Sequence, residues 1–322
     1  MRRPVQLILH ILIAYGFARS QWLWLPGQGL TMGRGSSGTN LPGPLGPMVA
    51  AFTVTTLTEG RAGLVDLLQR MGRLPKRPGA FLAGLAMPVV LATGALGWQV
   101  LHGHPLPPFA AFTAFPGLAA GTGLAGVLVV LGLNGFGEET GWRGWLFDTL
   151  CAKHGPFLSA VIVALVWMLR HLPLFWLNPT LHALIGPLLL GWAAGLVLGS
   201  FVLAHICQFT ERSTLAAAVW HVPYNYYVAT EATSGIVAAV VSSAVMAWGA
   251  GVALVWGRHW WRNRATLAEG PQKDGGRAAA TGLSSTASAA IALCSVFRTM
   301  LRRLAGTVES RAPGRVLPFC HH

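Results

Sequence analysis

Long apolar runs alternate with short polar connections along most of the chain. A helix needs roughly 20 residues to cross a hydrocarbon core of about 30 Å, and these runs approach or reach that length. The pattern therefore predicts an all-α, polytopic membrane protein with about eight transmembrane helices. The predicted spans are residues 5–25, 43–58, 79–101, 117–137, 157–177, 184–206, 213–230 and 236–257.

The composition excludes a water-soluble globule of this size. Hydrophobic residues make up 53% of the 322 residues and charged residues only 10%, which leaves too little polar surface for a soluble domain. The net charge of +13 is carried largely by the connections on one side of the predicted membrane and by the C-terminal region. It indicates membrane topology rather than nucleic-acid binding, so we expect the lipid bilayer and no nucleic acid as partners.

The basic residues give the predicted orientation. Residues 61–77 contain five Lys or Arg residues, whereas residues 102–115 and 178–183 contain none. The positive-inside rule then places both termini in the cytoplasm, with the protein as a multi-pass protein of the plasma (inner) membrane. The first span also resembles a signal peptide, with a basic start and small residues at 14–18. An uncleaved first helix keeps the parity of the other seven spans, so we expect the first span to be retained.

The sequence divides into three predicted regions. Residues 1–116 are predicted to form N-terminal transmembrane helices, residues 117–257 a transmembrane core, and residues 258–322 a basic cytoplasmic tail. Within the tail, residues 265–290 are typical of a flexible linker, and residues 293–304 have the spacing of a basic amphipathic helix. Such a helix would lie on anionic lipids of the inner leaflet. A disordered basic tail without a specific partner is the alternative.

Two adjacent carboxylates are the first candidates for chemistry. Only ten residues are acidic, and Glu138 and Glu139 directly follow an apolar run. A carboxylate beside hydrocarbon is costly and persists where it is paired or used. Arg143 lies one helical turn after Glu139, which predicts an ion pair between them, while Glu138 projects about 100° away. We therefore expect Glu139 to support the structure and Glu138 to act as the general base.

Two later helices each carry a polar pair at one-turn spacing, Trp167 with His171 and His221 with Asn225. Glu138 and His171 lie at similar distances from the turn predicted between their helices, so an antiparallel hairpin would bring them together. The later pair re-enters from the same side, which predicts a polar cavity that faces the cytoplasm. A base, a water-orienting histidine, and a His and an Asn as oxyanion donors suit amide hydrolysis without a covalent intermediate.

At these residues the chain resembles the CAAX prenyl endopeptidase and bacteriocin-processing (CPBP, or ABI) family of intramembrane proteases. The resemblance covers roughly residues 118–230. The motifs that carry it are Glu138-Glu139-x-x-x-Arg143, an aromatic residue four positions before His171 with the spacing aromatic-x-x-x-His, and His221-x-x-x-Asn225.

The family resemblance implies an endopeptidase in which Glu138 and His171 activate water while His221 and Asn225 stabilise the tetrahedral oxyanion. It also implies a peptide or membrane-protein substrate and no cofactor or metal ion. Three residues differ from the usual family pattern: Trp167 replaces Phe, Arg170 directly precedes His171, and Pro223 lies between His221 and Asn225.

Two other classes of function remain open. The first is a catalytically silent membrane protein that binds a peptide or confers bacteriocin immunity, and the second is a proton-coupled transporter that uses Glu and His as a relay. Other intramembrane protease chemistries lack their residues. Asp66, Asp148 and Asp274 do not lie well inside any predicted span, and no His is followed by Glu as the H-E-x-x-H zinc motif requires.

Overall fold

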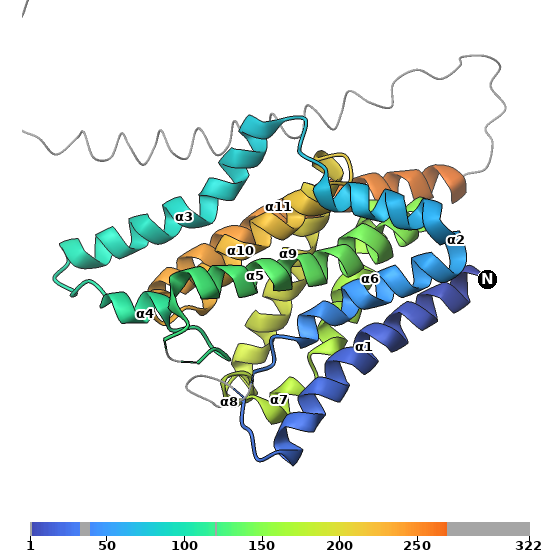
Figure 1. The fold of residues 1–322 in the computed structure, drawn as a ribbon. Helices are drawn as coiled ribbons and strands as arrows, with labels where there is room; N and C mark the ends of the chain where they lie inside the picture. Colours follow the sequence, from blue (N-terminus) through green and yellow to red (C-terminus); the bar gives the residue numbers. More distant parts are fainter. Residues whose placement is uncertain (1, 33–38, 120, 269–322) are drawn as a thin grey trace, which may run out of the picture. The chain divides into compact units, whose positions relative to one another are not determined.

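The computed structural model describes residues 2–32, 39–119 and 121–268. Every regular element within these residues is helical, which confirms the all-α prediction (Figure 1). The elements, in chain order, are α1 (Arg3–Gly27), η1 (Gly43–Leu45), α2 (Gly46–Gly72), α3 (Pro78–Leu101), α4 (Phe109–Thr113), α5 (Gly123–Glu139), η2 (Thr140–Phe147), α6 (Asp148–Arg170), α7 (Leu174–Leu177), α8 (Pro179–His182), α9 (Pro187–Phe209), α10 (Thr214–Ala229), η3 (Glu231–Thr233) and α11 (Ile236–Ala268).

Each predicted span overlaps one long helix, but the bounds differ: residues 157–177 run past the end of α6 at Arg170 into α7, and residues 117–122 precede α5. Four stretches of the described residues are long and apolar enough to cross a membrane: Pro78–Leu101, Gly123–Leu177, Pro187–Phe209 and Ile236–Arg262. The second of these contains two predicted spans, because α5 and α6 are joined by η2 without a break. The chain is thus a multi-pass membrane protein. The number of eight spans stays a prediction, since α1 and α2 carry polar and charged residues and α10 has only 16 residues.

Two helices change direction at a glycine. Gly60 in α2 has φ 62° and ψ −148°, and Gly155 in α6 has φ 72° and ψ 171°. A side chain would strain both conformations, so glycine is the residue that permits them. Gly155 lies in the turn that the sequence predicts between two spans, and beyond it α6 packs back against η2. The end of α6 therefore returns to the level of the end of α5.

The last residues of α5 are held tightly from two sides. α10 packs along α5 (Figure 1), and η1 also contacts α5. A Cβ atom on Gly135 would lie 2.7 Å from the carbonyl oxygen of Ala218, and one on Gly137 would lie 2.6 Å from that of Pro44. Small residues allow such close backbone approach between helices. The carboxylates that follow Gly137 are thereby fixed between α10 and η1.

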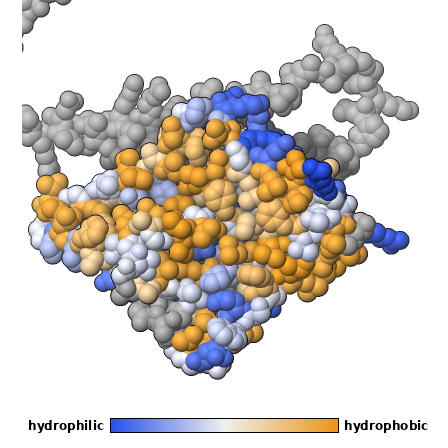
Figure 2. Space-filling view, in the orientation of Figure 1, coloured by the Kyte–Doolittle hydropathy of each residue, from blue (hydrophilic) through white to orange (hydrophobic). Residues whose placement is uncertain are grey.

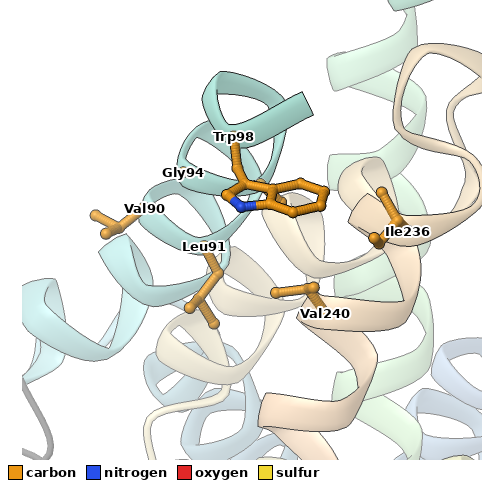
Figure 3. A pocket seen from close by; sticks show the side chains of 7 residues that line it. Val90, Leu91, Gly94, Trp98, Ile236 and Val240 are labelled. Atoms are coloured by element: carbon orange, nitrogen blue, oxygen red, sulfur yellow. The ribbon is translucent and has the colours of Figure 1, made fainter. Parts of the chain in front are cut away.

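The outer surface is largely apolar. Figure 2 shows hydrophobic residues over much of one face, with hydrophilic residues gathered near the connection between α2 and α3. A pocket of about 420 Å³ lies between α3 and α11, and Figure 3 shows the side chains that line it, which include Leu91, Trp98 and Val240. Its lining is apolar and contains none of the polar residues that the sequence predicts for the site.

The C-terminal region differs from the prediction at its start. α11 continues to Ala268, so the helix extends beyond residue 257, and residues 265–268 are helical instead of opening a linker. The chain divides into one compact unit of residues 1–262 and a second of residues 263–322. The rest of the predicted linker and the predicted amphipathic helix at 293–304 lie outside the described residues.

Candidate active site

Glu139 lies at the centre of a buried network that joins α5, η2 and α10. Its Oε1 accepts a hydrogen bond from Arg143 Nη1 at 3.0 Å and another from His221 Nδ1 at 3.0 Å. Glu139 is fully buried, and Arg143 and His221 are 1% and 2% exposed. The ion pair of Glu139 with Arg143 confirms the prediction from their spacing. The bond from His221 was not predicted and links α10 directly to the first motif.

Glu138 points to a different cation. Its Oε1 accepts a hydrogen bond from Arg170 Nη2, at the end of α6, and the two side chains form an ion pair. His171 and His221 also lie within electrostatic range of the Glu138 carboxylate. No partner is predicted from the sequence for Arg170, the charge that departs from the family pattern. The structure identifies that partner as the predicted general base itself.

His171 caps the C-terminus of α6 and is oriented by a backbone atom. Its Nδ1 lies 2.8 Å from the carbonyl oxygen of Trp167. Because a carbonyl oxygen only accepts, Nδ1 must carry the proton, and in the neutral ring Nε2 then presents a lone pair. The Trp167 ring also meets the His171 ring edge to face, with centroids 6.2 Å apart, so both the backbone and the ring of Trp167 contact this imidazole.

The Trp167 ring has other neighbours. The Arg143 guanidinium carbon lies 4.7 Å from the ring centroid, within the range of a cation–π contact. The His221 ring meets Trp167 edge to face, with centroids 5.9 Å apart. Trp167 is 8% exposed. It therefore packs between the groups of the first motif and the His221 ring.

Asn225 lies one turn after His221 on α10 and is half-buried. Within the described residues its side chain makes none of the hydrogen bonds that hold the other polar groups. Pro223 lies inside α10, which nevertheless continues as one helix to Ala229. The structure thus brings together Glu138, Glu139, Arg143, Trp167, His171 and His221 through direct contacts or electrostatic range, and places Asn225 on the helix of His221.

Residues beyond the predicted set also shape the site. Arg170 Nη1 donates a hydrogen bond to the carbonyl oxygen of Gly43 in η1 at 3.1 Å. The Arg170 guanidinium carbon lies 5.5 Å from the centroid of Trp22 and 5.8 Å from that of Trp142. Arg170 itself carried a usable signal, since a lone arginine in an apolar segment needs a partner. The contacts with Gly43 and Trp22 depend on tertiary structure and had no signal in the sequence.

The π-helical segment η2 directly follows the two carboxylates. Its residues are all buried, and Gly141 lies against Pro47 so closely that a Cβ atom would overlap that residue. Arg70 Nη1 donates to the carbonyl oxygen of Gly144 at 2.5 Å. Single π-helical turns occur often at functional sites. Here the π-helical segment η2 packs against α2 and directly follows Glu138 and Glu139.

The described residues contain no group of three or more His, Cys, Asp or Glu side chains arranged to hold a metal ion. The carboxylates of the site are already bonded to cations. Arg170 holds Glu138, and Arg143 holds Glu139.

The comparison with known proteins agrees with the site. Residues 120–227 match the family model of the Type II CAAX prenyl endopeptidase Rce1-like proteins, and this range contains every residue from Glu138 to Asn225. Residues 120–227 are a CPBP-family domain. CAAX prenyl protease 2 of Methanococcus maripaludis is 24% identical to the chain over 216 residues, which cover 63% of this chain and 77% of the relative.

The CPBP-family domain does not include the whole site region. Gly43 and Trp22, which contact Arg170, precede residue 120. The N-terminal helices therefore contribute contacts to the carboxylate of the first motif.

Proposed function

We propose that this protein is a CAAX prenyl protease 2-like intramembrane endopeptidase, which hydrolyses a peptide bond with water activated by Glu138 and His171. The observation that carries the proposal is the convergence of Glu138, His171 and His221 from three helices inside the family-matched range. These groups can supply a base and polarising donors without a covalent intermediate.

Two bases would share the attacking water. Arg170 occupies Oε1 of Glu138, which leaves Oε2 to accept a proton. The Nε2 lone pair of neutral His171 is a second acceptor, because its Nδ1 proton is bound to the Trp167 carbonyl. A water held between these two acceptors would be oriented for attack on a substrate carbonyl.

The charge on His221 decides what this residue can donate. Its Nδ1 must carry a proton, since the Glu139 carboxylate only accepts. Nε2 then carries a proton only in the imidazolium form. In that form His221 donates to the developing oxyanion or protonates the leaving amine. The Asn225 amide, one turn along α10, is the second oxyanion donor.

The proposed substrate class rests on the name of the relative, CAAX prenyl protease 2. A CAAX prenyl protease acts on the C-terminal motif of prenylated proteins, so we propose a peptide or membrane-protein substrate. We propose no metal requirement, because the carboxylates of the site are paired with arginines and a catalytic zinc needs three free protein ligands and an open position.

The test is cleavage of a quenched fluorescent, farnesylated CAAX peptide by the purified protein in detergent. Wild-type protein should cleave it, with and without EDTA. Asn225→Ala and the isosteric Asn225→Asp both lack the amide donor and should lose about 10²-fold in kcat. A kcat in these variants equal to that of wild type would overturn the role of Asn225. Loss of activity with EDTA and recovery with zinc would overturn the metal-free mechanism, and binding without cleavage would favour a silent peptide-binding protein.

We also propose that both termini lie in the cytoplasm and that the protein resides in the plasma membrane. Lys153 is exposed at the break in α6, and His104 is exposed in the connection after α3. Cysteine introduced at position 104 should react with an impermeant thiol reagent in intact cells, and cysteine at position 153 only after lysis. Labelling at position 153 in intact cells would invert the topology. The background for both lacks Cys151, Cys207, Cys294 and Cys320.

A further inference from the structure

Arg170 is an enclosed charged group that directly contacts the candidate site. It is fully buried, and its two terminal nitrogens bind different groups, Nη2 the Oε1 atom of Glu138 and Nη1 the carbonyl oxygen of Gly43 at 3.1 Å. Trp22 and Trp142 both lie within cation–π range of its guanidinium. Five elements, α1, η1, α5, η2 and α6, therefore meet at this one side chain.

The planar guanidinium makes this arrangement directional. Its nitrogens keep a fixed angle to one another, so a bond to the backbone of η1 sets where the bond to Glu138 can lie. A Lys side chain would supply the charge without that geometry. The position of the Glu138 carboxylate therefore depends on Gly43, a residue outside the range 120–227 that matches the family. Glu138 keeps 6% of its surface exposed.

The second consequence concerns charge. An unpaired carboxylate in an apolar environment tends to take up a proton, and a protonated Glu cannot act as a base. Several ionisable groups surround Glu138 and Arg170, namely Glu139 on α5, Arg143 on η2, His171 on α6, His221 on α10 and Tyr15 on α1. Arg143 is committed to Glu139. Among the described residues, Arg170 is the arginine bonded to Glu138.

We propose that Arg170 is a positioning residue that fixes the Oε1 atom of Glu138 and keeps this carboxylate ionised, so that Oε2 faces the reacting water. The inference deepens the proposed endopeptidase function and rests on it for the role of the water. The effect of Arg170 on the position and charge of Glu138 does not depend on any substrate.

The experiment compares Arg170→Lys and Arg170→Met with wild type. Infrared difference spectra against Glu138→Gln report whether the Glu138 carboxyl is ionised or protonated, without any substrate. Wild type and Arg170→Lys should show an ionised carboxylate at neutral pH, and Arg170→Met a protonated acid. In the peptide assay, Arg170→Lys should lower kcat by about 10²-fold with little change in KM, because the charge remains but the geometry is lost.

Arg170→Met should also move the acid limb of the kcat/KM profile to higher pH, since a proton then binds Glu138 more readily without the neighbouring cation. A purely structural role would lower the amount of folded protein and leave this profile in place. Arg19→Met is the matched control. Arg19 lies over the Tyr15 ring at 4.9 Å on α1 and makes no contact with Glu138, so its profile and spectrum should equal those of wild type.

The possible outcomes separate the two proposals. An ionised Glu138 in Arg170→Met, or an unchanged kcat in Arg170→Lys, would overturn the inference. If the infrared changes occur as expected but neither wild type nor any variant cleaves the peptide, the effect of Arg170 on Glu138 is supported and the endopeptidase function is overturned. If Arg170→Met does not fold, the pair Glu138→Gln/Arg170→Met should recover folded protein, because it removes both charges together. Failure of this recovery would show that Arg170 supports the fold independently of Glu138 and would overturn the inference.

Discussion

Glu138→Gln should reduce turnover by about 10²-fold to 10⁴-fold, the usual contribution of a positioned general base. The amide has the volume of the carboxyl and its oxygen can still accept the hydrogen bond from Arg170, but it cannot take a proton from water. The variant should therefore fold. It should be somewhat less stable than wild type, because Arg170 keeps Gly43 and two indole rings as partners but loses an anion.

The measurement is kcat on the farnesylated peptide, together with gel filtration and thermal unfolding in detergent. Glu231→Gln is the control, since Glu231 is exposed in η3 and has no contact with the site. Turnover in Glu138→Gln equal to that of this control would remove Glu138 from the mechanism.

The local part of the site could be predicted because it depends on helical spacing alone. Glu139 and Arg143 are one turn apart, and the structure contains their ion pair. Glu138 and the end of α6 meet because the chain reverses at Gly155, and glycine with proline in that segment was a readable turn signal. These two features place the first and second motifs without any knowledge of the remaining helices.

The partners of Arg170 and His221 could not be predicted, because they depend on the packing of distant segments. Arg170 and Glu138 are 32 positions apart, and Gly43 is 127 positions from Arg170. His221 shares a helix face with Asn225 in the sequence, but its bond to Glu139 requires the close approach of α10 to α5. The π-helical geometry of η2 likewise has no periodicity that an apolar pattern reveals.

The helices could be predicted from the sequence, but the number of helices that cross the membrane could not. Apolar runs identify α3, α9 and α11 directly, since each satisfies length and hydropathy. α1 and α2 contain buried polar groups such as His10 and Arg70, and hydropathy underestimates helices whose polar side chains face the interior of a bundle. Whether α1 and α2 cross the membrane therefore depends on how they pack and not on their composition.

Glu139→Gln should affect stability first and turnover second. Glu139 is fully buried and bonded to Arg143 and His221. Removing one partner of a buried ion pair typically costs about 3–5 kcal/mol, because the other charge stays buried without compensation. Among the described residues, Arg143 has no second carboxylate in hydrogen-bond contact, and its Nε and Nη2 atoms have no hydrogen-bond partner there. The cost should therefore fall near the upper part of that range.

Unfolding by denaturant in detergent micelles gives the free energy of unfolding, and the double variant Glu139→Gln/Arg143→Met supplies the comparison. The double variant should be more stable than Glu139→Gln, since it removes the unpaired charge as well. Its turnover should remain low, because it lacks the carboxylate that orients the His221 ring. Wild-type stability in Glu139→Gln, or a double variant less stable than the single one, would show that the Glu139–Arg143 pair does not hold η2 against α5.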